Sequence, residues 1–135
     1  MHALQHQGIR QADLRLGENC AVIGLGLVGQ LTVQMLKAGG IKTIGIDIDQ
    51  RMVDLALHTD IDAAFTRNSE DLESSINNIT NGYGTDAVII TAGTDSLDPV
   101  DLAGALCRKK GKVVIVGAVP TGFKRPNYVK KELGL

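Results

Sequence analysis

Short runs of apolar, mostly β-branched residues recur along the chain, and no other feature of the sequence constrains its fold as strongly. Four of them are CAVIGL at 20–25, KTIGIDI at 42–48, DAVIITA at 86–92 and KVVIVGAV at 112–119, and a weaker run, DAAFTR, covers 62–67. Runs that stay largely apolar from one residue to the next are typical of strands buried on both faces of a sheet. The sequence therefore predicts five strands, and the run at 62–67 predicts a short edge strand.

Segments with the spacing of amphipathic helices separate these runs. One covers 27–38, a second begins after the N-cap Asp49, a third covers 69–80, and the last has Asp98 as its N-cap and ends before Gly111. Strands that alternate with helices are joined by right-handed crossovers and form a parallel sheet. The sequence thus predicts an α/β fold with a doubly wound parallel sheet in the strand order 3-2-1-4-5.

The composition limits the size of the fold and the range of partners. A length of 135 residues is that of one domain, and 44% apolar but only 3% aromatic residues predict a core of aliphatic side chains. A net charge of −1 provides no electrostatic footprint for nucleic acid or an anionic membrane. No apolar run reaches the ~18 residues of a membrane span, and the N-terminus lacks the apolar centre of a signal peptide. The chain is therefore expected to be cytoplasmic, with Cys20 and Cys107 as reduced structural thiols.

The two ends of the chain differ from the alternating region between them. Residues 1–18 predict a lead-in helix and turn, and residues 19–119 carry the five strands. Residues 120–135 predict a linker followed by the start of a truncated sixth strand, which begins in KKELGL. These last residues do not suggest an antiparallel hairpin at the end of the sheet.

Three glycines mark the junction between the first strand and the first helix. Gly24, Gly26 and Gly29 form a G-x-G-x-x-G pattern directly after a predicted strand and at the opening of a predicted helix. In this pattern the first glycine permits the tight turn, the second lets a pyrophosphate approach the backbone, and the third lets helix and sheet pack closely. The first helical turn, with Leu27 and Val28, offers free N–H groups and a partial positive charge of roughly half a unit. The junction predicts a phosphate site in a Rossmann fold.

An acidic residue follows at the end of the second strand. Asp47 lies 18 residues after Gly29, where its carboxylate can accept both hydroxyl hydrogens of an adenosine ribose. A 2′-phosphate would meet this carboxylate at close range, so NAD is expected in preference to NADP. Arg51 weakens that inference because a guanidinium could receive a 2′-phosphate, and Ile48 completes the candidate residues of this region. Two interpretations without a ligand also fit: a packing turn for the glycines and a helix cap for Asp47.

Small residues follow the fourth and fifth strands, on the path expected for the nicotinamide half of a dinucleotide. Ligands of such sheets lie outside the carboxyl ends of the strands. Short turns that need small residues would produce the same pattern. The candidates are Thr91, Ala92, Gly93, Val116, Gly117 and Ala118.

The sequence contains no recognisable set of catalytic residues and no metal site. Hydride transfer needs a substrate site beside the nicotinamide, usually with an acid-base group or a metal. His2 and His6 have helical i, i+4 spacing but no third ligand, and His58 falls in the last turn of a predicted helix. We therefore expect the chain to bind a cofactor without supplying the catalytic groups.

Three stretches together resemble the nucleotide-binding domain of medium-chain dehydrogenases/reductases of the zinc-type alcohol dehydrogenase group. They are GIRQADLRLGENCAVIGLGLVGQLTVQMLKAGGIKTIGIDID, GYGTDAVIITAG and LCRKKGKVVIVGAV, and the resemblance covers roughly residues 7 to 119. The tail RPNYVKKELGL is similar to that of two-part bacterial oxidoreductases. The resemblance implies a Rossmann domain that belongs to an NAD-dependent enzyme, with the isolated chain inactive.

The same resemblance implies roles for the candidate residues and for parts of a parent protein. Gly24, Gly26 and Gly29 would contact the pyrophosphate and Asp47 the adenosine ribose. Residues 91–93 would lie near the link between ribose and nicotinamide, and residues 116–118 near the nicotinamide carboxamide. A GroES-like catalytic domain would supply any zinc, the proton relay and most substrate contacts, and a sixth strand would allow homo-oligomers to form.

Two other classes share part of this pattern. Regulatory nucleotide-sensing domains attached to ion transporters have similar glycines, acid and length, but they do not account for the lead-in of about 18 residues or the ending CRKKGKVVIVGAV. Methyltransferases that bind S-adenosylmethionine also combine glycines with a ribose-binding acid, and their sheets normally end in an antiparallel hairpin.

Overall fold

The fold is a six-stranded sheet in the order β3-β2-β1-β4-β5-β6. A computed structural model describes residues 9, 12–92, 98–116 and 128–133. The strands are β1 (Asn19–Ile23), β2 (Lys42–Asp47), β3 (Ala63–Thr66), β4 (Thr85–Ile90), β5 (Cys107–Val116) and β6 (Tyr128–Leu133), and the helices are α2 (Leu27–Ala38), α3 (Gln50–Leu57), α4 (Leu72–Ile79) and α5 (Asp98–Leu106). Strands β1 to β5 are parallel. The predicted α/β fold and strand order 3-2-1-4-5 are confirmed.

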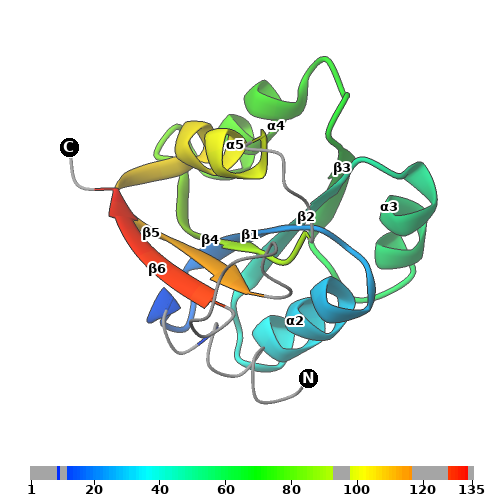
Figure 1. Cartoon of the computed structure of the whole chain (residues 1–135), viewed down its shortest axis with the longest axis horizontal. Coiled ribbons are helices and arrows are strands. Elements are labelled where there is room, and N and C mark those ends of the chain that lie inside the picture. The colour runs from blue at the N-terminus through cyan, green and yellow to red at the C-terminus, as the bar shows by residue number, and fades with distance from the viewer. Residues whose placement is uncertain (1–8, 10–11, 93–97, 117–127, 134–135) are drawn as a thin grey trace, which may run out of the picture.

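The helices cover both faces of the sheet because alternate strand residues point to opposite sides. Cys20 and Val22 of β1 belong to the core beneath α2 and α3, whereas Ala21 and Ile23 belong to the core beneath α4 and α5. Figure 1 shows these two helical layers on opposite sides of the strands. Both faces of the central strands are buried, which is why these strand sequences are apolar from one residue to the next.

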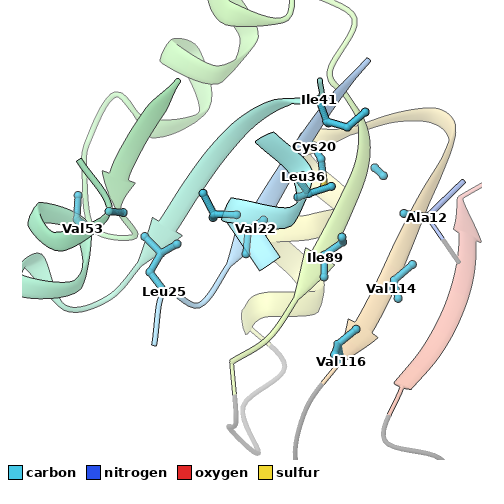
Figure 2. Close-up of a cluster of buried hydrophobic side chains, with 13 residues drawn as sticks. Ala12, Cys20, Val22, Leu25, Leu36, Ile41, Val53, Ile89, Val114 and Val116 are labelled. Carbon is cyan, nitrogen blue, oxygen red and sulfur yellow. The ribbon is translucent and has the colours of Figure 1, made fainter. Parts of the chain in front are cut away.

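The core beneath α2 and α3 is built from aliphatic side chains, as the composition predicts. Val22 of β1, Ile89 of β4 and Val114 of β5 lie on one face, against which Leu36 of α2 packs (Figure 2). Each of these side chains is 1% exposed or less. Burial of one such side chain stabilises a fold by about 1.5–3 kcal/mol, so this layer holds α2 firmly on the sheet.

The ends of two helices agree with their predicted caps. Helix α2 covers the predicted 27–38, and Gly40 after it has a φ of +78°, a conformation that favours glycine. Asp49 caps α3, since its side chain accepts a hydrogen bond of 2.9 Å from the backbone N–H of Arg51.

The boundary between the last helix and β5 differs from its prediction. Helix α5 ends at Leu106, and β5 begins at once with Cys107, although the sequence predicts helix almost to Gly111 and strand only from 112. The register of β4 and β5 shifts between Thr85 and Ala87, and Lys110 has a φ of +63°. A bulge therefore carries the polar residues 107–111 into the strand, which no apolar pattern predicts.

The last strand also corrects an expectation. β6 pairs with β5 in antiparallel orientation, from Gly111 opposite Leu133 to Val116 opposite Tyr128. The expected sixth strand is present, begins earlier than KKELGL, and lies beside β5 in Figure 1. The expectation that the chain ends without an antiparallel pair is wrong, so this feature no longer separates the chain from methyltransferases.

Candidate functional site

A pocket of about 340 Å³ opens at the carboxyl ends of the central strands. Such crevices are where open α/β sheets bind their ligands, and the volume falls at the lower end of the range for small-molecule sites. Residues from the ends of β1, β2 and β4, from the segment after β3 and from the start of α5 line it. They are Ile23, Gly24, Gly26, Ile46, Asp47, Ile48, Arg67, Thr91, Ala92, Asp98 and Pro99.

Two of the three glycines are required by the backbone itself. Gly24 has a φ of +104°, and a Cβ there would lie 2.7 Å from the backbone nitrogen of Ala92. A Cβ on Gly29 would collide with the carbonyl oxygen of Gly24. The turn out of β1 and the first turn of α2 are thus packed against each other, so these two positions need glycine with or without a ligand.

Gly26 is different, because the space beside it is open. A Cβ at this position would meet no atom within 4 Å. Gly26 is also the N-cap of α2, and no side-chain hydrogen bond caps the helix there. The first-turn N–H groups of Leu27, Val28 and Gly29 have no partner within the helix, although none of these three residues is part of the pocket lining, as Gly26 is.

Two side chains hold the loop between β1 and α2 at Leu25. Asp47 accepts a hydrogen bond of 2.7 Å from the Leu25 N–H through Oδ2, and Gln30 Nε2 donates one of 2.9 Å to the Leu25 carbonyl. The Leu25 side chain is fully buried, and the Gln30 side chain also donates to the Met52 carbonyl at 3.4 Å. Backbone and side chain of Leu25 are therefore both anchored, which fixes the positions of Gly24 and Gly26 on either side.

The Asp47 carboxylate lies beside this loop, as the sequence predicts. Its Oδ1 accepts a second backbone hydrogen bond, 2.8 Å from the N–H of Asp49. A carboxylate has about four acceptor positions, so one on each oxygen remains for a ligand. Asp47 thus supports the loop and lines the pocket at the same time.

Of the two other residues predicted near Asp47, Ile48 lines the pocket and Arg51 does not. The Ile48 side chain lines the pocket although it is 76% exposed, which leaves an apolar surface at the pocket mouth. Arg51 does not line the pocket, and its guanidinium, with 85% of the side chain exposed, pairs with Asp49 at 2.9 Å. The Arg51 pairing lowers the pKa of the Asp49 carboxyl.

The predicted nicotinamide path is described only in part. Thr91 and Ala92 line the pocket, and Thr91 Oγ1 donates a hydrogen bond of 2.7 Å to the Gly24 carbonyl, which ties the fourth strand to the glycine turn. Val116 is buried at the end of β5 and is not part of the pocket lining. Gly93, Gly117 and Ala118 lie outside the described residues.

The site also includes residues that were not predicted from the sequence: Gln30, which holds the loop at Leu25, and in the pocket lining Ile23, Ile46, Arg67, Asp98 and Pro99. Arg67 Nε and one terminal nitrogen each donate to the Asp98 carboxylate at 2.9 Å, so this ion pair joins the segment after β3 to α5. The run DAAFTR ends in a charged residue at the carboxyl end of a strand, and that signal could have identified Arg67. Asp98 was recognised only as a helix cap, because its partner is 31 residues away.

The imidazoles and thiols do not form a reactive cluster in the described part of the chain. His58 Nδ1 lies 2.7 Å from the Asp54 carbonyl at the end of α3, and His2 and His6 lie outside the described residues. Both cysteines are free, and burial raises the pKa of the Cys107 thiol to about 11 and that of Cys20 further. Among residues 9, 12–92 and 98–116, no group of three His, Cys, Asp or Glu side chains could hold a metal ion. None of the described helices is long and apolar enough to cross a membrane.

The fold is that of a Rossmann domain, and sequence comparison assigns the chain to a family. Residues 28–133 match the family described as zinc-binding dehydrogenase. The chain belongs to this family and is an NAD(P)-binding domain of the zinc-dependent alcohol dehydrogenase type. The resemblance noted in the sequence is thereby confirmed, and neither alternative class is supported.

Curated relatives include dehydrogenases of alcohols and polyols. The chain is 33% identical to the NAD-dependent alcohol dehydrogenase of Sulfurisphaera tokodaii over 88% of its own length and 34% of the relative's. It is 31% identical to the sorbitol dehydrogenase of Halalkalibacterium halodurans over 98% of its length and 40% of the relative's. An NADP-dependent isopropanol dehydrogenase of Thermoanaerobacter brockii is 34% identical over 64% of this chain and 25% of that protein. The chain thus spans about a quarter to two fifths of these relatives.

Solved structures agree with this assignment. The alcohol dehydrogenase TADH from Thermus sp. ATN1 superposes with a TM-score of 0.79 at 25% identity, over 90% of this chain and 35% of the other. A dehydrogenase structure from Sinorhizobium meliloti, bound to NADP, gives a TM-score of 0.77 at 27% identity over 90% and 36% of the two chains. Relatives that use NAD and relatives that use NADP are therefore both similar to this chain.

Proposed function

We propose that this domain binds NAD(H) in the pocket at the carboxyl ends of the strands and positions the nicotinamide for hydride transfer in a zinc-type alcohol dehydrogenase-like oxidoreductase. One observation carries the proposal: the open helix terminus at Gly26 and the carboxylate of Asp47 belong to the same pocket. A pyrophosphate binds at an open helix terminus, and a ribose diol donates hydrogen bonds to a carboxylate. Their combination in one crevice fits a dinucleotide better than a simple phosphate.

The preference for NAD over NADP follows from the charges around this pocket. Among the residues that line it, Asp47 and Asp98 are acidic and Arg67 is the basic one. The guanidinium of Arg67 is already paired with Asp98, so a 2′-phosphate would meet uncompensated negative charge at Asp47. A ribose 2′-hydroxyl, by contrast, can donate to the free acceptor positions of Asp47.

The proposed contacts follow the order of the elements along the pocket. Gly24 to Gly29, with the N–H groups of Leu27 and Val28, hold the pyrophosphate, while Asp47 and Ile48 hold the adenosine. Arg51 remains a candidate only for a phosphate at the pocket margin, because its guanidinium is engaged by Asp49. Toward the nicotinamide, the proposed contacts are Thr91, Ala92, Gly93, Val116, Gly117 and Ala118.

The proposed division of the chain is a lead-in at 1–18, a dinucleotide-binding domain at 19–119 and a linker with the sixth strand at 120–135. The nicotinamide supplies the hydride acceptor or donor when it is bound, and this chain orients it. We propose that a GroES-like domain of the parent chain supplies the catalytic groups and any zinc, and that the parent protein forms homo-oligomers. The isolated domain would then bind dinucleotide without turning over an alcohol, and a cytoplasmic location stays a prediction.

Titration of the 135-residue chain with NADH and NADPH, followed by nicotinamide fluorescence, tests this proposal. We expect saturable binding of both, with NADH bound more tightly. Asp47→Ala should weaken NADH binding by about tenfold or more and narrow the gap between the two dinucleotides, because a charge-assisted hydrogen bond is worth about 1.5–3 kcal/mol.

Asp54→Ala is the matched control, since Asp54 is another acid of the same region that does not line the pocket and contacts Gln50 on the surface of α3. It should leave both affinities unchanged. The proposal is wrong if the folded chain binds neither dinucleotide, or if it binds NADPH more tightly than NADH. If Asp47→Ala leaves the difference between NADH and NADPH affinity unchanged, Asp47 does not contact the ribose.

A further inference from the structure

The pocket is bridged by an ion pair that the cofactor assignment leaves without a role. Arg67 follows β3, and Asp98 begins α5. The guanidinium donates from Nε to one carboxylate oxygen and from a terminal nitrogen to the other, both at 2.9 Å. Neither residue is buried: the two side chains are 34% and 47% exposed. A two-point contact in this geometry orients both side chains much better than a single exposed ion pair does.

Arg67 is placed next to the proposed ribose site by the sheet itself. Thr66 of β3 lies opposite Asp47 of β2 in the parallel register, and the Arg67 backbone N–H donates to the Asp47 carbonyl at 2.9 Å. Both side chains line the same pocket. The guanidinium is therefore the basic group that shares a pocket with the carboxylate expected to hold the ribose.

The chemistry of a guanidinium makes its partner important. Its planar fork of donors matches a carboxylate and a phosphate equally well. Asp98 uses two of these donors and also compensates the charge, and this hydrogen bonding lowers the pKa of the Asp98 carboxyl and raises that of Arg67. A second anion that approached Arg67 would have to displace Asp98 or lie beside it.

We propose that Asp98 is a specificity-determining residue, which favours NAD over NADP because it occupies the Arg67 guanidinium that would otherwise receive a 2′-phosphate. The inference rests on the proposed function, since it assumes that the adenosine ribose binds beside Asp47. It adds that discrimination against NADP comes from two acids. Asp47 repels the 2′-phosphate directly, and Asp98 pairs with the Arg67 guanidinium that could otherwise compensate the charge of this phosphate.

Arg51 and Asp49 provide a comparison within the same molecule. This pair has a similar N–O distance of 2.9 Å, but neither residue lines the pocket and the Arg51 side chain is 85% exposed. Releasing Arg51 from Asp49 frees a guanidinium of the same kind outside the site. If position in the pocket is what matters, freeing Arg67 from Asp98 should change the relative affinity for NADPH, and freeing Arg51 from Asp49 should not.

The test measures the ratio of NADPH to NADH affinity in the wild-type 135-residue chain and in four variants. Asp98→Asn keeps the size of the side chain but frees Arg67, and it should raise the ratio by about tenfold, mainly through tighter NADPH binding. Arg67→Gln should not raise the ratio, and the double variant Asp98→Asn/Arg67→Gln should return it close to the wild-type value. Asp49→Asn, which retains a good helix cap, should leave the ratio unchanged.

The outcomes separate this inference from the function on which it rests. If the wild-type chain binds NADH but Asp98→Asn leaves the ratio unchanged, the role of Asp98 is wrong and the proposed function stands. If Asp49→Asn raises the ratio and Asp98→Asn does not, Arg51 is the phosphate receiver and the inference is overturned. If neither the folded wild-type chain nor any variant binds either dinucleotide, both the function and the inference fail. Far-ultraviolet circular dichroism confirms that each variant is folded.

Discussion

The two ends of the sheet use polar groups in opposite ways. At the amino ends of the strands, Asp86 accepts a hydrogen bond from the Asn19 N–H at 2.9 Å, Asn19 accepts one from the Asp86 N–H at 2.8 Å, and Arg108 pairs with Asp86 at 2.8 Å. At the carboxyl ends, the terminus of α2 has no side-chain cap and open space beside Gly26. Polar groups that satisfy one another stabilise the fold, and groups left open can bind a ligand.

This contrast also applies to the pockets at the two ends. The pocket at the amino ends has a volume of about 180 Å³, and most of the residues that line it are charged, among them Asp86, Arg108 and Lys112. Lys112 pairs with Asp13 at 3.3 Å. The pocket at the carboxyl ends is larger and is lined by glycines, isoleucines and few charges. The two pockets thus differ in how many of the residues that line them are charged.

The largest expected effect is on the packing of the glycine turn. Gly29→Ala should destabilise the domain by about 3 kcal/mol, because the new methyl group collides with the Gly24 carbonyl, a backbone atom that cannot move alone. Gly104→Ala is the matched control: Gly104 lies inside α5, and a Cβ there would meet no atom within 4 Å. That variant should gain up to about 1 kcal/mol from helix propensity. Urea denaturation measures both, and equal effects would contradict the packing interpretation.

Removing the acid at the amino ends should affect stability without affecting binding. Asp86→Ala leaves the Asn19 N–H and the Arg108 guanidinium without this partner, and it should lower the free energy of unfolding by about 2 kcal/mol. The NADH affinity of the folded chain should stay at the wild-type value. A loss of affinity comparable to that of Asp47→Ala would show that the two ends of the sheet are coupled rather than separate.

A smaller effect is expected at Gln30, whose side chain holds the loop between β1 and α2 at Leu25. Gln30→Leu removes the donor to the Leu25 carbonyl and should destabilise the domain by about 1–2 kcal/mol while it also weakens NADH binding, since the loop is less well held. Gln34→Leu, one turn further along α2 on an exposed position, should change neither quantity. If Gln30→Leu lowers stability but leaves NADH affinity intact, Gln30 supports the fold alone.

The smallest effect concerns the two thiols. Burial keeps the pKa of Cys107 at about 11 in the folded state, above its ordinary value of about 8.5. The stabilising contribution of the neutral thiol is therefore complete below about pH 8.5 and is lost as the pH rises through 11. Iodoacetamide should modify Cys107 slowly at pH 8 and faster toward pH 11, and it should modify buried Cys20 only in denaturant. Rapid labelling of Cys20 in the folded chain would contradict this.

Much of the fold could be predicted because its signals are local. The apolar run at 20–25 and the glycines that follow predicted β1, the turn and the start of α2, since each depends on neighbouring residues only. The start of β5 could not be predicted, because residues 107–111 are polar and enter the strand through a bulge held against β4. The antiparallel orientation of β6 likewise depends on its pairing with β5.

The candidate site shows the same division. Gly24, Gly26 and Asp47 were recognised from spacing, and the structure brings all three into one pocket. Arg67 and Asp98 were not recognised as a pair, because a charge at a strand end and a helix-cap position are local signals that do not reveal a partner 31 residues away. Sequence patterns report what a residue needs from its neighbours along the chain, and long-range partners leave no trace in a single sequence.

The sequence by itself determined the alternation of strands and helices, the order of the parallel sheet and the glycine turn, because hydrophobic periodicity and backbone conformation are properties of short segments. Only the tertiary structure decided which polar groups are paired and which remain open: Asp86 pairs with Arg108 at one end of the sheet and Arg67 with Asp98 at the other, whereas the helix terminus at Gly26 has no side-chain cap. Pairing depends on distances between groups far apart in the chain, and those distances exist only after the sheet has assembled.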